Sequence, residues 1–471
     1  MKRLSWLVGL AVGVLSPSPA DAAGEGALDG AALDLFWVLP FAGLLLSMGV
    51  MPLAAPSFWH HHYGKVAAFW ALAFVLPLAT KHGVTVALHE LLHTALLEYI
   101  PFIALIVALF TIAGGIHVRG NLHGSPATNT ALLAIGASLA SLIGTTGASM
   151  LMIRPVLRAN DDRLHNAHVV VFFIFLVSNI GGALTPLGDP PLFLGFLKGV
   201  DFFWPLTFLW QPTLLVSGLL LVLFFAIDSH LYAKEGHLPR DPTPDRPLAI
   251  EGKVNFALLA LLVALVLASA LLPSFGKIRI AAIEMELKSV LRDLALAAIA
   301  LMSLQLTPQS VRMANNFSWG PALEVAKLFA AIFVTIIPAI AILRAGHSGA
   351  LAAVLALVTG PHGGPDNAMY FWLAGGLSSF LDNAPTYLVF FNAAGGDPKQ
   401  LMVPLATTLM AISAGSVYMG ANTYVGNAPN FMVKSIAEEN GVKMPSFFGY
   451  MLWSGGILIP CFLLVHWLYF K

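Results

Sequence analysis

The sequence predicts an all-α, polytopic membrane protein with two inverted repeats of about five spans each. Three observations support this prediction. The chain has 471 residues and is only 10% charged, whereas soluble domains carry about 25% charged residues. Many of its apolar runs reach the roughly 20 residues that a helix needs to cross a bilayer. Two polar passages inside such runs, one starting at Gly182 and one at Gly420, repeat each other.

The repeated passages align without gaps. Residues 182–193 and 420–431 place Gly, Ala, Thr, Gly, Pro and Phe at the same positions, and Asp189 stands where the second copy has Asn427. The copies are 238 residues apart. A second pair of polar passages aligns with a spacing of 237 residues, which sets Thr145 opposite Asp382. Paired broken helices at matching places in two halves indicate the substrate site of a secondary transporter.

Each half is expected to contain five spans, one of them broken, and one re-entrant hairpin. In the first half we predict spans at residues 33–50, 64–79, 100–117, 167–200 (broken) and 206–227, with the hairpin at 130–153. In the second half we predict spans at 254–272, 287–306, 322–343, 401–439 (broken) and 447–470, with the hairpin at 369–391. Because five is an odd number, the second half must start on the other side of the membrane.

The chain divides into four parts on this basis. Residues 1–22 resemble a signal peptide, with an uncleaved anchor as the alternative, because a charged start precedes a short apolar core and a small-residue cleavage pattern. The first repeat covers 33–227, a cytoplasmic linker 228–253, and the second repeat 254–470. We expect a multi-pass protein of the bacterial inner membrane.

Composition also narrows the function. The net charge is zero, so nothing suggests a nucleic-acid partner. Cys461 is the only cysteine, which excludes internal disulfides and thiolate metal clusters. Residues 84–97 and 280–293 mix charged and apolar side chains, and we predict amphipathic helices that lie on the membrane surface there. His60, His61 and His62 are expected in an interfacial loop.

Four polar clusters should meet halfway across the membrane, at two hairpin tips and two helix breaks. A broken helix frees backbone carbonyls that coordinate cations and N–H groups that favour anions. The side chains expected to bind an ion or substrate are Thr145, Thr146, Ser149, Asn179, Thr185, Asp189, Asp382, Asn383, Thr386, Asn422, Thr423 and Asn427. The residues expected to break the helices are Gly182, Gly188, Pro190, Pro191, Pro385, Gly420, Gly426 and Pro429.

Asp189 and Asp382 are the two acids in these clusters. An ionisable group inside a span is costly and therefore indicates function. A carboxylate that holds either a proton or Na⁺, but not both, is the minimal mechanism of an exchanger. The alternative is structural, because both acids precede prolines and could cap a half-helix.

Three further charged residues are secondary candidates. Glu98 and Glu324 stand at the head of the third span of each half, as helix-end acids or as proton carriers. Lys327 either neutralises an acid or extends to the interface. Residues 89–93 match the H-E-x-x-H zinc motif, but no convincing third ligand follows, so an intramembrane zinc protease is a distant alternative. We expect no resident metal or cofactor.

The long motifs resemble those of the ion transporter superfamily, which holds NhaD-type sodium/proton antiporters, arsenite permeases and citrate or dicarboxylate carriers. The similar segments are residues 178–191, 380–386 and 420–430. The resemblance implies inverted repeats with two hairpins, ion-motive-force coupling and a homodimer. Leu192 departs from the pattern, since relatives often carry Asn there. The hairpin tips at 145–147 and 382–384 also lack the Ser-Asn-Thr of dicarboxylate carriers.

These features together predict a non-enzymatic secondary transporter. The first expectation is a Na⁺/H⁺ antiporter that works by alternating access. The alternative is a Na⁺- or H⁺-coupled carrier of citrate or another small organic anion. An acid such as Asp382 at a hairpin tip repels a carboxylate substrate, unless bound Na⁺ screens it.

Overall fold

A computed structural model describes residues 28–236 and 247–471. The predicted signal peptide at 1–22 and part of the predicted linker lie outside these residues. The described chain is all-α apart from four short strands, and ten of its helices are long and apolar enough to cross a membrane. The predicted fold class is confirmed.

The first half follows the predicted order of spans and hairpin. After η1 (Gly30–Ala32), its elements are η2 (Leu35–Val38), α2 (Leu39–Ala54), α3 (Pro56–His82), α4 (Val84–Thr94), η3 (Ala95–Tyr99), α5 (Ile100–Ala113), β1 (His117–Arg119), α6 (Pro126–Ile143), α7 (Thr145–Ala159), α8 (Ala167–Leu176), η4 (Ile180–Leu184), α9 (Pro190–Leu197) and α10 (Trp204–Glu235). Helices α6 and α7 form the hairpin, and α8, η4 and α9 form the broken helix.

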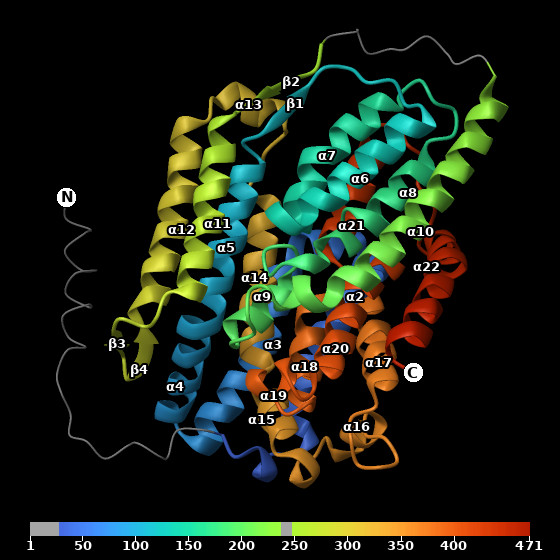
Figure 1. Cartoon of the computed structure of the whole chain (residues 1–471). Helices are drawn as coiled ribbons and strands as arrows, with labels where there is room; N and C mark the ends of the chain where they lie inside the picture. Colours follow the sequence, from blue (N-terminus) through green and yellow to red (C-terminus); the bar gives the residue numbers. More distant parts are fainter. Residues whose placement is uncertain (1–27, 237–246) are drawn as a thin grey trace.

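The second half repeats this order with short insertions. Its elements are β2 (Ala249–Glu251), α11 (Val254–Leu271), β3 (Lys277–Ile280), β4 (Ile283–Glu286), α12 (Leu287–Leu306), α13 (Gln309–Ala314), α14 (Gly320–Thr335), α15 (Ile337–Arg344), η5 (Gly346–Ser348), α16 (Ala352–Leu357), α17 (Asn367–Phe380), α18 (Asn383–Ala393), α19 (Pro398–Met402), α20 (Ala406–Tyr418), η6 (Met419–Asn422), α21 (Ala428–Glu439) and α22 (Phe447–Tyr469). The α6/α7 and α17/α18 hairpins lie toward opposite ends of the molecule (Figure 1), as expected for inverted repeats.

The same hydrogen bonds recur in the two halves. The Thr185 hydroxyl donates to the carbonyl oxygen of Ser141, and the Thr423 hydroxyl donates to that of Ser379. Each threonine hydroxyl also accepts the backbone N–H two residues further on, at 3.2 Å in both cases. These bonds join each hairpin to the break of its own half, so hairpin and break form one structural unit per repeat.

The hairpin tips follow the same spacing as the breaks. Helices α7 and α18 begin at Thr145 and Asn383, so these residues are equivalent, and Asp382 matches Gly144. The sequence alignment of Thr145 with Asp382 was therefore wrong by one residue. Gly144 has φ +80°, a conformation that favours glycine, whereas Asp382 reaches its turn with φ −56°.

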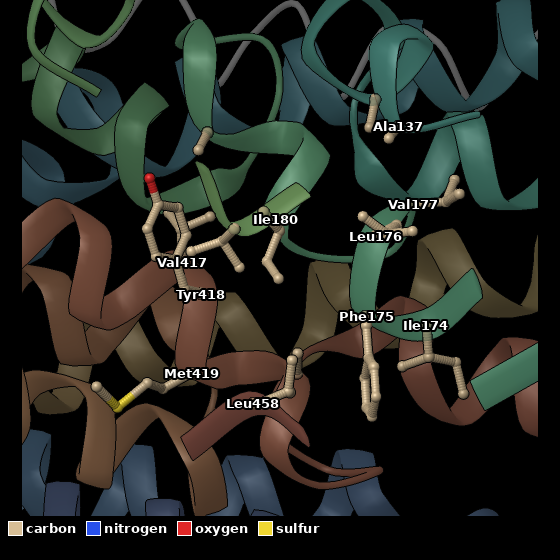
Figure 2. Packing of buried hydrophobic residues seen from close by; sticks show 14 of the residues in the cluster. Ala137, Ile174, Phe175, Leu176, Val177, Ile180, Val417, Tyr418, Met419 and Leu458 are labelled. Carbon is tan, nitrogen blue, oxygen red and sulfur yellow. The ribbon is translucent and has the colours of Figure 1, made fainter. Parts of the chain in front are cut away.

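Two apolar clusters form the interior. The first joins the hairpins to α8, α10, α20 and α22, and Figure 2 shows part of it around Phe175 and Tyr418. The second joins α2, α3, α5, α11, α12 and α14. Helices α9 and α18 contribute to both, since Leu192 packs in the first cluster and Phe193 in the second. The two helices that begin beside the polar tips therefore lie where the clusters meet.

Residues 84–97 do not form a separate surface helix, so that prediction is wrong. Helix α4 passes through the π-helical turn η3 into α5, giving one apolar helix, Val84–Ala113. The wide turn directly precedes Pro101, which lacks the N–H for a regular helical bond. The apolar run on both sides of the turn carries the helix onward.

Residues 280–293 form the β3–β4 hairpin and the start of α12 instead of an amphipathic helix. Ala281 and Ala282 have φ values of +46° and +70°, as a two-residue hairpin turn requires. Burial then alternates along β4, which is the period of a strand. His60–His62 lie within α3 instead of a loop, and residues 228–235 end α10 instead of beginning the linker.

Candidate functional site

The Asp189 carboxyl lies where all four polar clusters meet. Asp189 is only 1% exposed. Its Oδ1 accepts from the Thr145 hydroxyl at 2.9 Å and from Asn427 Nδ2 at 3.3 Å, and its Oδ2 accepts from Asn383 Nδ2 at 2.5 Å. These donors come from the first hairpin, the second break and the second hairpin. One carboxyl of the first break is thus bound by all the other clusters.

Local geometry explains why this carboxyl points inward. Asp189 has an extended backbone at the head of α9, where prolines occupy the first positions, and its side chain makes no capping bond. The capping alternative for Asp189 is therefore wrong. Asn427 has the same extended backbone at the head of α21. The N–H of Thr145 donates to the carbonyl of Gly188 at 2.8 Å, which fixes the hairpin tip against the break.

Glycines allow each break to fold back on itself. A Cβ on Gly188 would collide with the carbonyl oxygen of Gly182, and one on Gly426 would collide with that of Gly420. The repeated passages therefore need glycine at these positions for close approach of two backbone segments.

Replacing Gly188 with alanine is expected to distort the first break. The added methyl group meets rigid backbone, so we expect a loss of about 1–3 kcal/mol in stability and a marked loss of transport. Thermal unfolding in detergent and uptake by proteoliposomes measure the two effects. Gly218→Ala in α10 is the matched control, because its Cβ would meet nothing within 4 Å. Equal behaviour of the two variants would contradict the prediction.

Asp382 keeps its capping role. Its carboxylate accepts the backbone N–H of Ala384 at 3.1 Å, and its carbonyl accepts the Thr386 hydroxyl at 3.0 Å. The next residue, Asn383, donates to the buried Asp189 carboxyl, so Asp382 lies beside the site. The predicted capping bond of Asp382 is therefore present, and a role for the same carboxylate at an ion site stays a prediction.

Three asparagines connect the two breaks. Asn427 Nδ2 lies 3.2 Å from Asn179 Oδ1, and Asn179 Nδ2 donates to Asn430 Oδ1 at 2.8 Å. All three side chains are buried. Asn430 was not among the predicted site residues, although it lies in the second repeated passage, at the position where the first has Leu192.

The other predicted side chains surround this centre. Ser149 shares a 2.8 Å hydrogen bond with Ser178, and Asn422 Nδ2 donates to Ser379 Oγ at 2.9 Å. Thr185 and Thr423 bond the hairpins as described above. Thr146 is half-buried beside Thr145. The predicted prolines Pro190, Pro191, Pro385 and Pro429 all lie in the first turn of α9, α18 or α21.

The secondary candidates lie elsewhere. Glu98, in the π-helical turn, pairs with Lys198 at 2.5 Å, with side chains 13% and 17% exposed. This ion pair ties the α4–α5 helix to the end of α9. Lys327 is exposed and its Nζ lies over the Tyr63 ring. Glu324 lies on α14. None of these three contacts Asp189 among the described residues.

Reversing the Glu98–Lys198 pair should show whether it stabilises the junction. We expect Glu98→Lys to cost about 1–2 kcal/mol, between the values for exposed and buried pairs. The double variant Glu98→Lys with Lys198→Glu should regain most of this loss. Thermal unfolding of both proteins tests the prediction, and a double variant as unstable as the single one would contradict it.

The H-E-x-x-H motif gains no support from the structure. The His89 and His93 rings stack, with centroids 6.3 Å apart. Within residues 28–236 and 247–471, no group of three or more His, Cys, Asp or Glu side chains could hold a metal ion.

A buried charge cluster was missed by the sequence reasoning. Arg163 bonds Asp228 at 2.8 Å and Glu235 at 2.5 Å, and all three side chains are 0% exposed. His168 Nε2 lies 2.9 Å from the same Asp228 oxygen. Asp228 and Glu235 are two helical turns apart on one face of α10, a spacing that could have signalled the cluster. It fastens the base of the first hairpin to α10, since Arg163 also donates to Gly124 O at 2.7 Å.

Residues 30–470 match a protein family described as "Putative citrate transport". The chain belongs to this family. It is therefore a multi-pass membrane protein and a secondary transporter, not an enzyme, and its resemblance to the ion transporter superfamily is confirmed on the citrate-transporter side. No curated protein matches the chain.

Proposed function

We propose that this member of the citrate-transport family is a Na⁺- or H⁺-coupled carrier of a small organic anion such as citrate. The observation that carries the proposal is the hydrogen bonding of the Asp189 carboxyl. It accepts from one donor in the first repeat and two in the second. A change in its charge alters its bonds to both hairpins and to the second break. The family match supports the class of substrate.

Asp189 and Asp382 are the proposed cation or proton sites. Asn383 Oδ1 and Asn422 Oδ1 are buried and accept no hydrogen bond from the described residues. An unsatisfied buried acceptor costs about 1–3 kcal/mol, and a bound cation would remove this cost. Amide, hydroxyl and carboxylate oxygens are hard ligands that suit Na⁺.

Charge balance sets the order of binding. A citrate carboxylate placed beside Asp189 and Asp382 is repelled unless a cation or proton has first neutralised them. The half-helices α7, α9, α18 and α21 begin around the site, and the positive ends of their helix dipoles favour an anion. Cation binding therefore precedes anion binding, which couples the two fluxes.

The position of the site suits alternating access. Helices α9 and α18 pack in both apolar clusters, so a displacement of one cluster against the other moves the heads of these helices. The side chains at those heads include Asp189 and Asn383. We therefore place the substrate at the junction of the two clusters. Their relative movement would expose it to one side of the membrane at a time.

Na⁺/H⁺ antiport without an organic anion is the second candidate. It is favoured by the lack of any Lys or Arg paired with Asp189 or Asp382 in the described part of the chain. With no protein cation to balance them, both acids would take their counter-charge from transported Na⁺ or H⁺.

Purified protein in proteoliposomes distinguishes the candidates. The main proposal predicts uptake of radiolabelled citrate that is driven by an inward Na⁺ or H⁺ gradient and stops when an ionophore collapses the gradient. A Na⁺-dependent change of internal pH without citrate uptake would favour antiport. Neither flux, in protein that is folded and correctly inserted, would refute both.

A further inference from the structure

The two halves of the site also differ at two further pairs of equivalent positions. Asn430 and Leu192 occupy the same place in α21 and α9, and Asn179 and Val417 occupy the same place before the two breaks. The Asn179–Asn430 pair forms a buried 2.8 Å hydrogen bond between the repeats. Leu192 and Val417 instead lie in the first apolar cluster, where Figure 2 labels Val417 near Ile180.

The polar pair fixes the orientation of a chain of amides. Asn430 Nδ2 donates to the carbonyls of Gly420 at 2.8 Å and Thr423 at 2.9 Å, so its Oδ1 must face Asn179. Asn179 Nδ2 then donates to Asn430 Oδ1 and, at 2.8 Å, to the Ile174 carbonyl. The Oδ1 of Asn179 is thereby turned toward Asn427.

The last amide of the chain meets the carboxyl. Asn427 Nδ2 faces Asn179 Oδ1 at 3.2 Å, the Ser178 carbonyl at 3.0 Å and Asp189 Oδ1 at 3.3 Å. If the Asn427 amide were turned over, its oxygen would face all three acceptors, including a carboxylate. Each amide from Asn430 through Asn179 and Asn427 to Asp189 therefore has a donor facing an acceptor.

We propose that Asn430 is a positioning residue of the cation or proton site, acting on Asp189 through Asn179 and Asn427. This inference rests on the proposed function, because it assumes that Asp189 takes up the coupling ion. The apolar Leu192–Val417 pair gives the other half of the site no such relay. The two halves are therefore not equivalent, and coupling centres on Asp189.

Asn430→Leu tests the relay, because it gives the second repeat the leucine that the first already has. The readout is citrate uptake by proteoliposomes as a function of Na⁺ concentration and of pH. Loss of the Asn430 acceptor releases Asn179 and thereby weakens the hydrogen bond from Asn427 to Asp189. We expect the cation concentration for half-maximal uptake to rise about tenfold, the effect of one weakened hydrogen bond to a charged group. The maximal rate at saturating cation should stay within about twofold of wild type, a split that general misfolding would not produce.

Two further variants keep the test decisive. Asn430→Asp preserves the relay as the neutral acid, whose O–H donates to the carbonyl of Gly420 or Thr423 while its other oxygen accepts from Asn179. In that form it should keep the half-maximal concentration within about threefold of wild type. Val417→Ala, at the equivalent of Asn179, controls for a buried defect outside the relay and should leave the cation dependence unchanged.

The outcomes separate the two proposals. Wild-type cation dependence in Asn430→Leu would overturn the relay and leave the proposed function intact. A shift of about tenfold or more in Asn430→Asp would also overturn it, and this result can be obtained even if the leucine variant does not fold. Wild-type protein without any cation-dependent flux would refute the proposed function, and the relay with it.

Discussion

Asp189→Asn is expected to abolish cation-coupled uptake in a protein that still folds. The amide has the shape of the carboxyl but neither its charge nor its exchangeable proton. A unit charge acting on a cation 4 Å away is worth about 4 kcal/mol at an effective dielectric constant of 20, so uptake at a fixed cation concentration should fall by about two to three orders of magnitude. The new amide N–H also points at one of the donors that now bind Asp189.

Radiolabelled citrate uptake and Na⁺-dependent pH changes measure this effect in proteoliposomes. Asp366→Asn is the matched control, since Asp366 caps α17 through the N–H of Met369 and asparagine caps helices equally well. The control should transport at the wild-type rate. Undiminished coupling in Asp189→Asn would show that the ion binds elsewhere.

Much of the fold could be predicted because membrane spans are set by length and hydropathy alone. The hairpins and breaks were also predictable, since polar glycine- and proline-rich passages survive inside apolar runs only where protein or a wet cavity satisfies their backbone. The two predicted surface helices were wrong for different reasons. At Glu98 a single apolar helix continues through a polar turn. At Met285 the alternation of apolar and polar residues along a strand resembles the pattern of an amphipathic helix. The ends of the helices were harder to predict, because short segments at the membrane surface do not need a particular length.

The sequence predicts which residues form the site better than it predicts how their side chains are oriented. The internal repeat pointed to Asp189, Asn383 and Asn427 before any contact was known. Which acid caps a helix and which faces inward depends on backbone angles that Pro190 and Pro385 do not distinguish. Contacts between distant residues, such as the buried bonds of Arg163 and Asn430, leave no local pattern.

Arg163→Met is expected to be the most destabilising of the substitutions considered. The Arg163 side chain is fully buried between Asp228 and Glu235. Its loss removes the arginine charge from two buried acids, which keep His168, the amide of Asn129 and the backbone N–H of His165 as partners. Removing one member of a buried ion pair typically costs about 3–5 kcal/mol. The base of the first hairpin should loosen, because the bond to the Gly124 carbonyl is lost as well. Thermal unfolding in detergent measures the loss.

Two comparisons show whether unpaired charge is the cause. Arg119→Met removes an exposed partner of Glu251, with side chains 51% and 36% exposed, and should cost no more than about 1 kcal/mol. Adding Asp228→Asn and Glu235→Gln to Arg163→Met should recover part of the stability, since no buried charge is then left unpaired. If the triple variant were less stable than Arg163→Met alone, hydrogen bonding and packing, not charge compensation, would hold the hairpin to α10.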